Sequence, residues 1–245
     1  MTCITRVFTL IFCFSFSFFP LLHYSNARDA EILAAVILPA NNRNHISLSR
    51  VLPLLLMAEK EVKARHILNG LRFKFMPRDG SCNDQLAQIN AVEAYYKEHV
   101  NVFFGPTCEY CVAPIARMLQ FWDTPLLTTG AFTFDFTKNK TDTTIENSGE
   151  YKLLTRVSPM AFEGLTSVVI QILRRNGWRR VMLFYEKNGY DLLSGLHTCQ
   201  LMMETLVNGL KKEKVHYAAF DTEKNKGHTL THNLKVEIGG AFGGK

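Results

Sequence analysis

The chain has 245 residues, of which 47% are hydrophobic and 20% are charged, and its formal net charge is +6. This composition is typical of an ordinary globular protein rather than a disordered one, and the length leaves room for one large domain or two lobes. The cations are spread along the chain with acids between them, so we expect no nucleic-acid partner.

The first segment predicts export. Arg6 precedes an apolar run over residues 7–19, and Ser25-Asn26-Ala27 supplies the small residues that a signal peptidase needs. We interpret residues 1–27 as a signal peptide, so the expected location is secreted or at the extracellular face of the plasma membrane. The alternative is a membrane anchor, but the apolar run is shorter than the roughly 20 residues that cross a bilayer. No later stretch is long enough to be a membrane span.

Residues 28–150 are predicted to form a first α/β lobe. Short apolar runs alternate with longer amphipathic ones, which is typical of strands and helices around a parallel sheet. The predicted strands are residues 32–38, 71–76, 102–104 and a segment that begins at Pro125. The inward faces predicted for its three helices are Val51, Leu55, Ala58 and Val62, then Leu86, Ile89, Val92 and Tyr96, and then Val112, Ile115, Ala116 and Leu119.

A polar connection over residues 128–149 is predicted to mark a change of lobe, and its sequon predicts a glycan on Asn139. A partial second α/β lobe is predicted over residues 151–225, followed by an irregular Gly-rich tail over residues 226–245. The predicted elements of the second lobe are a crossing strand at 151–157, a helix at 162–176, a strand at 181–185, a helix along 196–210 and a strand at 215–220. The inward face predicted for the first of these helices is Leu165, Val168, Val169, Ile172 and Leu173. The predicted fold class is therefore α/β, with one doubly wound parallel sheet lobe and an incomplete second lobe.

The densest groups of cations lie at the ends of the predicted helices of the second lobe. There they interact favourably with the negative pole of the helix dipole, so a solvated structural role is favoured over a phosphate site. The two groups are Arg174, Arg175, Arg179 and Arg180, and Lys211, Lys212 and Lys214.

The mature chain keeps four cysteines, and in an exported protein these are first candidates for disulfides. They are Cys82, Cys108, Cys111 and Cys199. Their spacing leaves all three complete pairings open.

Residues 105–111 place two of these thiols where a strand, a tight turn and a helix start coincide. A Cys-x-x-Cys redox pair of Cys108 and Cys111 is one interpretation, because a helix N-terminus stabilises a thiolate. A zinc site is another, but its only close His pair is His228 and His232, in the tail. We favour a structural disulfide. No nucleophile elbow, dinucleotide-binding or phosphate-loop motif is present in the sequence, so no catalytic residue is predicted and the chain is not expected to be an enzyme.

An ordered set of motifs resembles the membrane-distal lobe of natriuretic peptide receptors. The motifs are Gly105-Pro106-Thr107-Cys108-Glu109-Tyr110, Ala113-Pro114-Ile115-Ala116-Arg117, Trp122-Asp123-Thr124-Pro125-Leu126, Thr129-Gly130-Ala131 and Leu154-Thr155-Arg156-Val157-Ser158-Pro159. The resemblance covers residues 32–220. It implies a two-lobed, doubly wound fold of the type I periplasmic-binding-protein kind that forms homodimers, binds a natriuretic-type peptide hormone and holds a chloride ion near its first disulfide.

Carried over to this chain, the resemblance implies a disulfide between Cys82 and Cys108. The residues that it implies face the peptide are Asp84, Tyr110, Glu150, Tyr151 and Tyr185. It implies that backbone N–H groups of Gly105, Thr107 and Cys108 hold the chloride. A structural role is the alternative for several of these residues, because Asp84 could cap the following helix and Tyr110 or Tyr185 could pack between lobes.

The chain departs from the family in two respects. Cys111 stands where the family usually has alanine, and Cys199 resembles the first cysteine of a second family disulfide, so one of them is free or the two pair with each other. The transmembrane and cyclase regions of the family do not follow, so we expect a truncated ectodomain or a fragment. The other functions considered are a small-ligand receptor of the same fold and a secreted thiol oxidoreductase.

Overall fold

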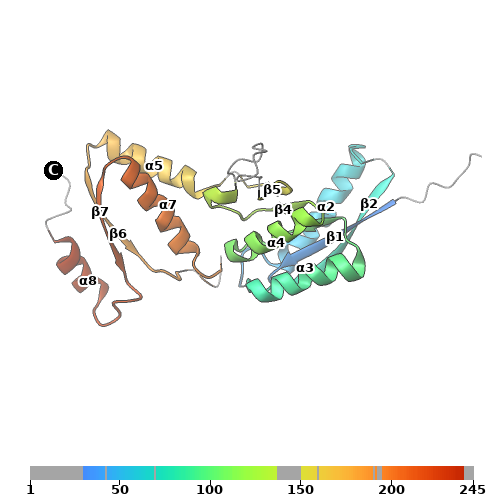
Figure 1. The fold of residues 1–245 in the computed structure, drawn as a ribbon, viewed down its shortest axis with the longest axis horizontal. Coiled ribbons are helices and arrows are strands. Elements are labelled where there is room, and N and C mark those ends of the chain that lie inside the picture. The colour runs from blue at the N-terminus through green and yellow to red at the C-terminus, as the bar shows by residue number, and fades with distance from the viewer. Residues whose placement is uncertain are drawn as a thin grey trace, which may run out of the picture.

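The computed structural model describes residues 30–41, 43–68, 70–136, 150–158, 160–189, 191 and 195–239. They form two α/β units, which lie next to each other along the long axis of the molecule (Figure 1). The predicted signal peptide and Asn139 lie outside the described residues. Within the described part of the chain, no helix combines the length and the apolar character that a membrane crossing requires.

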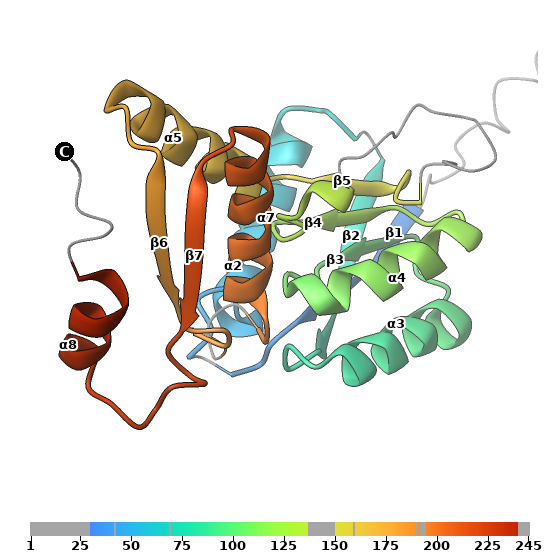
Figure 2. The same cartoon turned by 60° about the vertical axis from the view of Figure 1, so that its left-hand side comes forward.

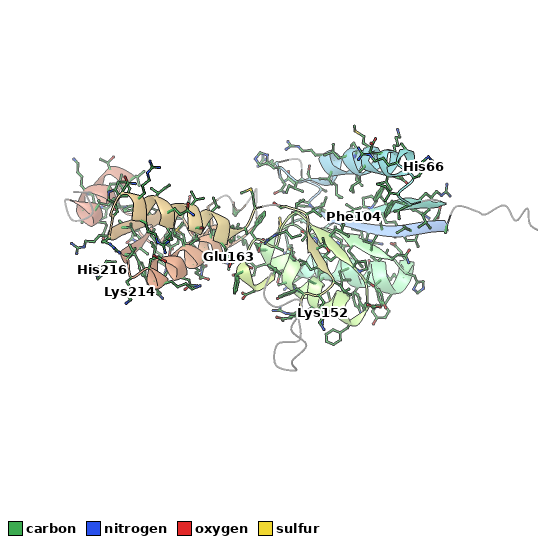
Figure 3. All side chains as sticks on the ribbon, turned by 90° about the horizontal axis from the view of Figure 1, so that it is seen from above. His66, Phe104, Lys152, Glu163, Lys214 and His216 are labelled. Carbon is green, nitrogen blue, oxygen red and sulfur yellow. A yellow bond between two sulfur atoms is a disulfide. The ribbon has the colours of Figure 1, made fainter. Side chains whose placement is uncertain are left out.

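The first unit is built on a five-stranded parallel sheet with the order β2-β1-β3-β4-β5. Its strands are β1 (Ala30–Leu38), β2 (Leu71–Asp79), β3 (Val102–Phe104), β4 (Leu126–Thr128) and β5 (Leu154–Arg156). Its helices are α2 (Leu48–Ala64), α3 (Asp84–Glu98) and α4 (Glu109–Phe121). Figure 3 shows α2 on one face of the sheet and α3 and α4 on the other. This arrangement confirms the predicted doubly wound α/β fold.

The core of the first unit lies between the sheet and helices α3 and α4. Strand β1 is central, and its residues 34–38 are at most 3% exposed, which explains their continuous apolar run. The stripe predicted for α4 is confirmed, because Val112, Ile115 and Leu119 are fully buried. Helix α2, on the other face of the sheet, packs loosely, since none of its 17 residues is buried.

Helix α3 turns a different face to the core from the one predicted. Its buried residues are Ala87, Ala91 and Ala94. The predicted inward residues Leu86, Ile89, Val92 and Tyr96 are instead 38%, 57%, 36% and 63% exposed. Three small side chains let the helix axis lie close to β1 and α4, and the larger side chains then point outward.

The second unit pairs two parallel strands with two helices on one face. The elements are α5 (Phe162–Arg175), β6 (Arg180–Tyr185), α7 (Thr198–Lys212) and β7 (His216–Asp221). Its small core consists of Ile170, Leu173, Leu210 and Val215. Gly209 allows α7 to approach α5, because a Cβ at this position would lie 2.4 Å from Cγ2 of Thr166.

The rotation of α5 also differs from the prediction. Leu173 is buried and Val169 packs against the second core, as predicted. Leu165, Val168 and Ile172 are 45%, 55% and 48% exposed. The contact with α7 selects a neighbouring stripe of the helix.

Two predicted boundaries are corrected. The first sheet continues past residue 150, because β5 pairs with β4 rather than crossing to the second unit. Leu154 and Tyr151 belong to the first core as a result. The tail is not irregular throughout, since α8 (Leu230–Asn233) and a π-helical turn over Leu234–Ile238 form within it.

Candidate ligand-binding site

A disulfide joins Cys82 to Cys108, as the resemblance implied, with 5.6 Å between the two Cα atoms. Cys82 lies just before α3, and Cys108 is the N-cap residue of α4. The bridge therefore holds the amino-terminal ends of two helices together. Each of these ends carries the positive pole of a helix dipole.

Asp84 and Tyr110 lie on either side of this disulfide and are both exposed. The alternative role of Asp84 as a helix cap is excluded, because the side chain of Asn83 accepts the capping hydrogen bond from Leu86 N–H at 2.8 Å. Asp84 lies near α4, since its charge contributes to raising the pKa of Cys111. Tyr110 is 49% exposed. The structure thus brings together the two side chains that were predicted from separate helices.

The second unit reaches the same place through the segment before α7. The ring of His197 packs edge-on against Tyr110, with 5.2 Å between the ring centroids. Gly195 has a φ of +87°, and a Cβ on it would lie 3.1 Å from Cβ of Cys108. Tyr110 therefore packs between the two units through its contact with His197, as the alternative prediction had it, and is still 49% exposed. Sequence reasoning missed Gly195 and His197, for which the sequence holds no signal beyond the glycine itself.

Glu109, the first residue of α4, is a buried residue that anchors a neighbouring loop. It is 4% exposed, and its carboxylate accepts hydrogen bonds from the backbone N–H groups of Phe132, at 2.7 Å, and Thr133, at 3.4 Å. Burial raises the pKa of Glu109, while these hydrogen bonds and the nearby charge of Arg156 act in the opposite direction. Glu109 therefore fixes the loop after β4 and does not face a ligand.

The three residues predicted to hold chloride differ in what they can donate. The Gly105 N–H donates to the Leu127 carbonyl at 2.8 Å, so it is not available to an anion. Gly105 is instead required by packing, because its φ is +76° and a Cβ would lie 2.4 Å from the Ile37 carbonyl oxygen. Thr107 is half-buried and Cys108 is buried, directly before the first turn of α4. Of the three predicted residues, Thr107 and Cys108 thus stay candidates for an anion contact, and the prediction for the Gly105 N–H is wrong.

The remaining predicted peptide contacts are separated from the disulfide. Glu150 is exposed and forms an ion pair with Arg117, which lies two turns along α4 from Tyr110. The prediction for Tyr151 is wrong in this structure, because its ring is 5% exposed and packs 4.8 Å from that of Phe136. Tyr151 precedes β5 by three residues and belongs to the core of the first unit.

Tyr185 ends β6 and is half-buried. It lines a cleft of about 370 Å³ between the second sheet and α7, together with Met203 and Lys211. Burial raises the pKa of Tyr185, and the carboxylates of Asp221 and Glu204 raise it further. Tyr185 is thus partly exposed to solvent, but its cleft belongs to the second unit and not to the surface beside the disulfide.

The two other cysteines remain free, so they do not pair with each other. Cys111 is 1% exposed, and burial raises the pKa of its thiol to about 12, with a smaller contribution from Asp84. The Cys199 thiol is half-buried and donates to the Gly189 carbonyl. Because Cys108 is bonded to Cys82, the Cys108 and Cys111 redox pair does not form.

The zinc alternative is not supported either. His228 and His232 lie 4.4 Å apart between ring centroids, at the start of α8. The described residues contain no group of three or more His, Cys, Asp or Glu side chains that could hold a metal ion.

Comparisons with known proteins give the family of the chain. Residues 50–228 match the receptor family ligand binding region. The atrial natriuretic peptide receptor 3 of Rattus norvegicus is 30% identical over 217 residues, which cover 81% of this chain and 37% of the receptor. A receptor-type guanylate cyclase of Caenorhabditis elegans, gcy-20, is 26% identical over 55% of this chain and 11% of its own length.

Solved structures show the same fold. A solute-binding protein of an ABC transporter from R. palustris, in complex with 4-hydroxybenzoate, superposes with a TM-score of 0.57 at 15% identity, over 86% of this chain and 52% of that protein. The chain thus spans about half the length of this neighbour and 37% of the length of the rat receptor. From its match over residues 50–228 and its α/β fold, the chain belongs to the receptor family ligand binding region.

Proposed function

We propose that this chain is the ligand-binding region of a receptor for a natriuretic-type peptide hormone and that the hormone contacts the surface beside the Cys82–Cys108 disulfide. The observation that carries the proposal is the joint exposure of Asp84 and Tyr110 on two helix starts that the disulfide holds together. The similarity to atrial natriuretic peptide receptors supports a peptide ligand. In such a role the chain binds and does not catalyse.

The two side chains suit a basic peptide. A tyrosine presents a rigid apolar ring with a polar tip, and it loses little conformational entropy on binding. A carboxylate at a helix start can form charge-assisted hydrogen bonds with an arginine of the hormone. Glu150, which is exposed and already pairs with Arg117, extends the acidic surface along α4.

Chloride binding and homodimer formation belong to the same proposal. The first turn of α4 offers backbone N–H groups and the positive end of the helix dipole to an anion next to Thr107. For the dimer, the outer face of α2 exposes Leu54 and Met57 at 61% and 65%, one turn apart. Large apolar side chains exposed at this spacing favour helix packing against a second copy. Export through residues 1–27 and a glycan on Asn139 complete the proposed extracellular protein.

The experiment is direct binding of natriuretic-type peptides to the secreted, glycosylated chain, measured by calorimetry. We expect Tyr110→Ala and Asp84→Asn each to weaken binding by roughly tenfold, since central interface residues contribute at least about 1.4 kcal/mol. The matched controls are Phe121→Ala, an 89% exposed aromatic at the other end of α4, and Asp123→Asn. Both controls are expected to bind as the wild type does.

Two results would overturn the proposal. One is a folded chain that binds none of these peptides at micromolar concentration. The other is an equal loss in the Tyr110→Ala and Phe121→Ala variants. Since the solved neighbour binds 4-hydroxybenzoate, a thermal-shift screen with aromatic acids, amino acids and sugars tests the small-ligand alternative on the same sample.

A further inference from the structure

Two basic segments that are far apart in the sequence meet at one end of the second unit. Helix α5 ends at Arg175 just before β6, and α7 ends at Lys212 just before β7. The strands pair with Arg180 opposite His216, and the His216 N–H donates to the Arg179 carbonyl at 2.9 Å. Figure 2 shows the ends of both helices and the beginnings of both strands along the same edge, and Figure 3 labels Lys214 and His216 side by side there.

We call this surface the basic face. It is made of Arg174, Arg175, Arg179, Arg180, Lys211, Lys212 and Lys214, and all seven side chains are exposed. Glu213 is the acid among them, and it pairs with Arg174, with Nε at 2.8 Å from Oε2. Among the described residues, no ion pair neutralises the other six cations.

Helix stabilisation accounts for only part of this charge. Four of the cations lie in the last turns of α5 and α7, where they favour the negative ends of the helix dipoles. Arg179, Arg180 and Lys214 lie beyond both helices, outside the last turn in which the dipole effect acts. Placing further like charges beside the first four raises their mutual repulsion, and a bound polyanion would offset that repulsion.

An aromatic cleft lies within the basic face. Trp178 is 43% exposed. It lines a cleft of about 300 Å³ together with Arg174, Arg179 and Glu213, over the apolar side chains of Leu173 and Val215. The cleft is thus lined by a partly exposed indole and by two guanidinium groups.

We propose that the basic face binds a sulfated polysaccharide of the glycosaminoglycan class. Guanidinium groups donate paired hydrogen bonds to tetrahedral oxyanions, and closely spaced cations match a polymer with repeated sulfates. The C–H face of a sugar ring packs on an exposed indole, which gives a polysaccharide an apolar contact in addition to those of its sulfates. The predicted export of the chain favours a polysaccharide over a nucleic acid.

The basic face is separate from the proposed hormone surface. Helix α7 has 15 residues and runs from His197, which touches Tyr110, to Lys212 in the basic face. At about 1.5 Å per residue, roughly 22 Å separate the two ends. The polysaccharide and the peptide can therefore be bound at the same time, and the failure of one activity leaves the other testable.

The test is the affinity of the full chain for a heparin oligosaccharide, measured by calorimetry across a range of salt concentrations. The variant combines Arg179→Gln, Arg180→Gln and Lys214→Gln. Its matched control removes three exposed cations from α2 through Arg50→Gln, Lys60→Gln and Lys63→Gln. We expect the variant to bind roughly tenfold more weakly or worse, with a slope of log affinity against log salt that is shallower by about 2 to 3, and the control to bind as the wild type does.

The outcomes decide between specific and general charge effects. Equal losses in the variant and its control, or equal binding of desulfated heparin, would overturn the proposal. Binding to phosphatidylserine vesicles that depends on the same residues, without heparin binding, would assign the surface to lipid instead. Trp178→Ala is expected to lower heparin affinity at constant salt slope, and an unchanged affinity would rule out the stacking contact.

Discussion

Removing the Cys82–Cys108 disulfide tests whether the site depends on this covalent link. The double variant Cys82→Ala/Cys108→Ala opens a loop with a sequence separation of 26 residues. In the chain-entropy description, closing a loop of this size lowers the entropy of the unfolded chain by about 12 cal/mol/K, which is about 3.5 kcal/mol at 25 °C. We expect the first unit to lose stability by this amount.

The two tryptophans of the chain make the assay specific. Trp122 stacks on Tyr95 in the first unit, with 4.3 Å between ring centroids, whereas Trp178 lies in the second. In a Trp178→Phe background, urea unfolding followed by the fluorescence of Trp122 reports the first unit alone. A loss of stability below about 1 kcal/mol would refute the reasoning, because it would mean that the loop is already restrained without the bond.

Four further tests address two glycines, one in each unit, and two buried titratable groups beside the site. Gly130→Ala should destabilise the first unit by roughly 2 kcal/mol or more, because its Cβ would lie 2.1 Å from the Thr107 carbonyl oxygen. Gly164→Ala, with no atom within 4 Å of its Cβ, should instead stabilise α5 by about 0.5–1 kcal/mol, and urea unfolding of both variants checks the contrast. The raised pKa of Glu109 means that its carboxyl group binds a proton more tightly in the folded chain than in the unfolded chain. The stability of the wild type should therefore fall as the pH rises from 4.5 through the raised pKa. Glu109→Gln should remove this part of the dependence of stability on pH. An unchanged profile would show that the carboxylate does not titrate in this window. Because burial raises the pKa of Cys111 to about 12, this thiol should resist alkylation at pH 8 until the chain unfolds, and peptide mapping of native protein labelled at Cys111 would contradict this.

The strands and one helix of the first unit could be predicted because they bury continuous or cleanly periodic apolar residues. Val112, Ile115 and Leu119 in α4 are an example, since these aliphatic residues recur three and four positions apart and all three are buried. In α3 the periodicity of large residues gave the opposite face from the buried Ala87 and Ala91. Hydrophobic size alone does not reveal that a helix must lie close to its neighbour, which depends on the partner surface.

The candidate site was predictable only where the family motif fixes it. The pairing of Cys82 with Cys108 came with the resemblance, since spacing left every pairing open. The contacts of Gly195 and His197 depend on how the second unit meets the first, and local sequence carries no record of that geometry. Tyr151 was assigned to the peptide because the resemblance implied an acidic-aromatic pair with Glu150, whereas its ring packs in the first core just before β5.

The unexpected orientation of α3 bears on how a hormone would be held. With its alanines facing the core, the helix turns Leu86 and Ile89 outward, 38% and 57% exposed. These side chains follow Asp84 by two and five residues, so at about 100° per residue they point to another face of α3 than Asp84 does. A peptide that pairs an arginine with Asp84 beside the disulfide would therefore not cover Ile89. Ile89→Ser should accordingly alter neither peptide affinity nor the stability of the first unit, and a loss of affinity in the binding assay would show that the hormone extends over a second face of α3.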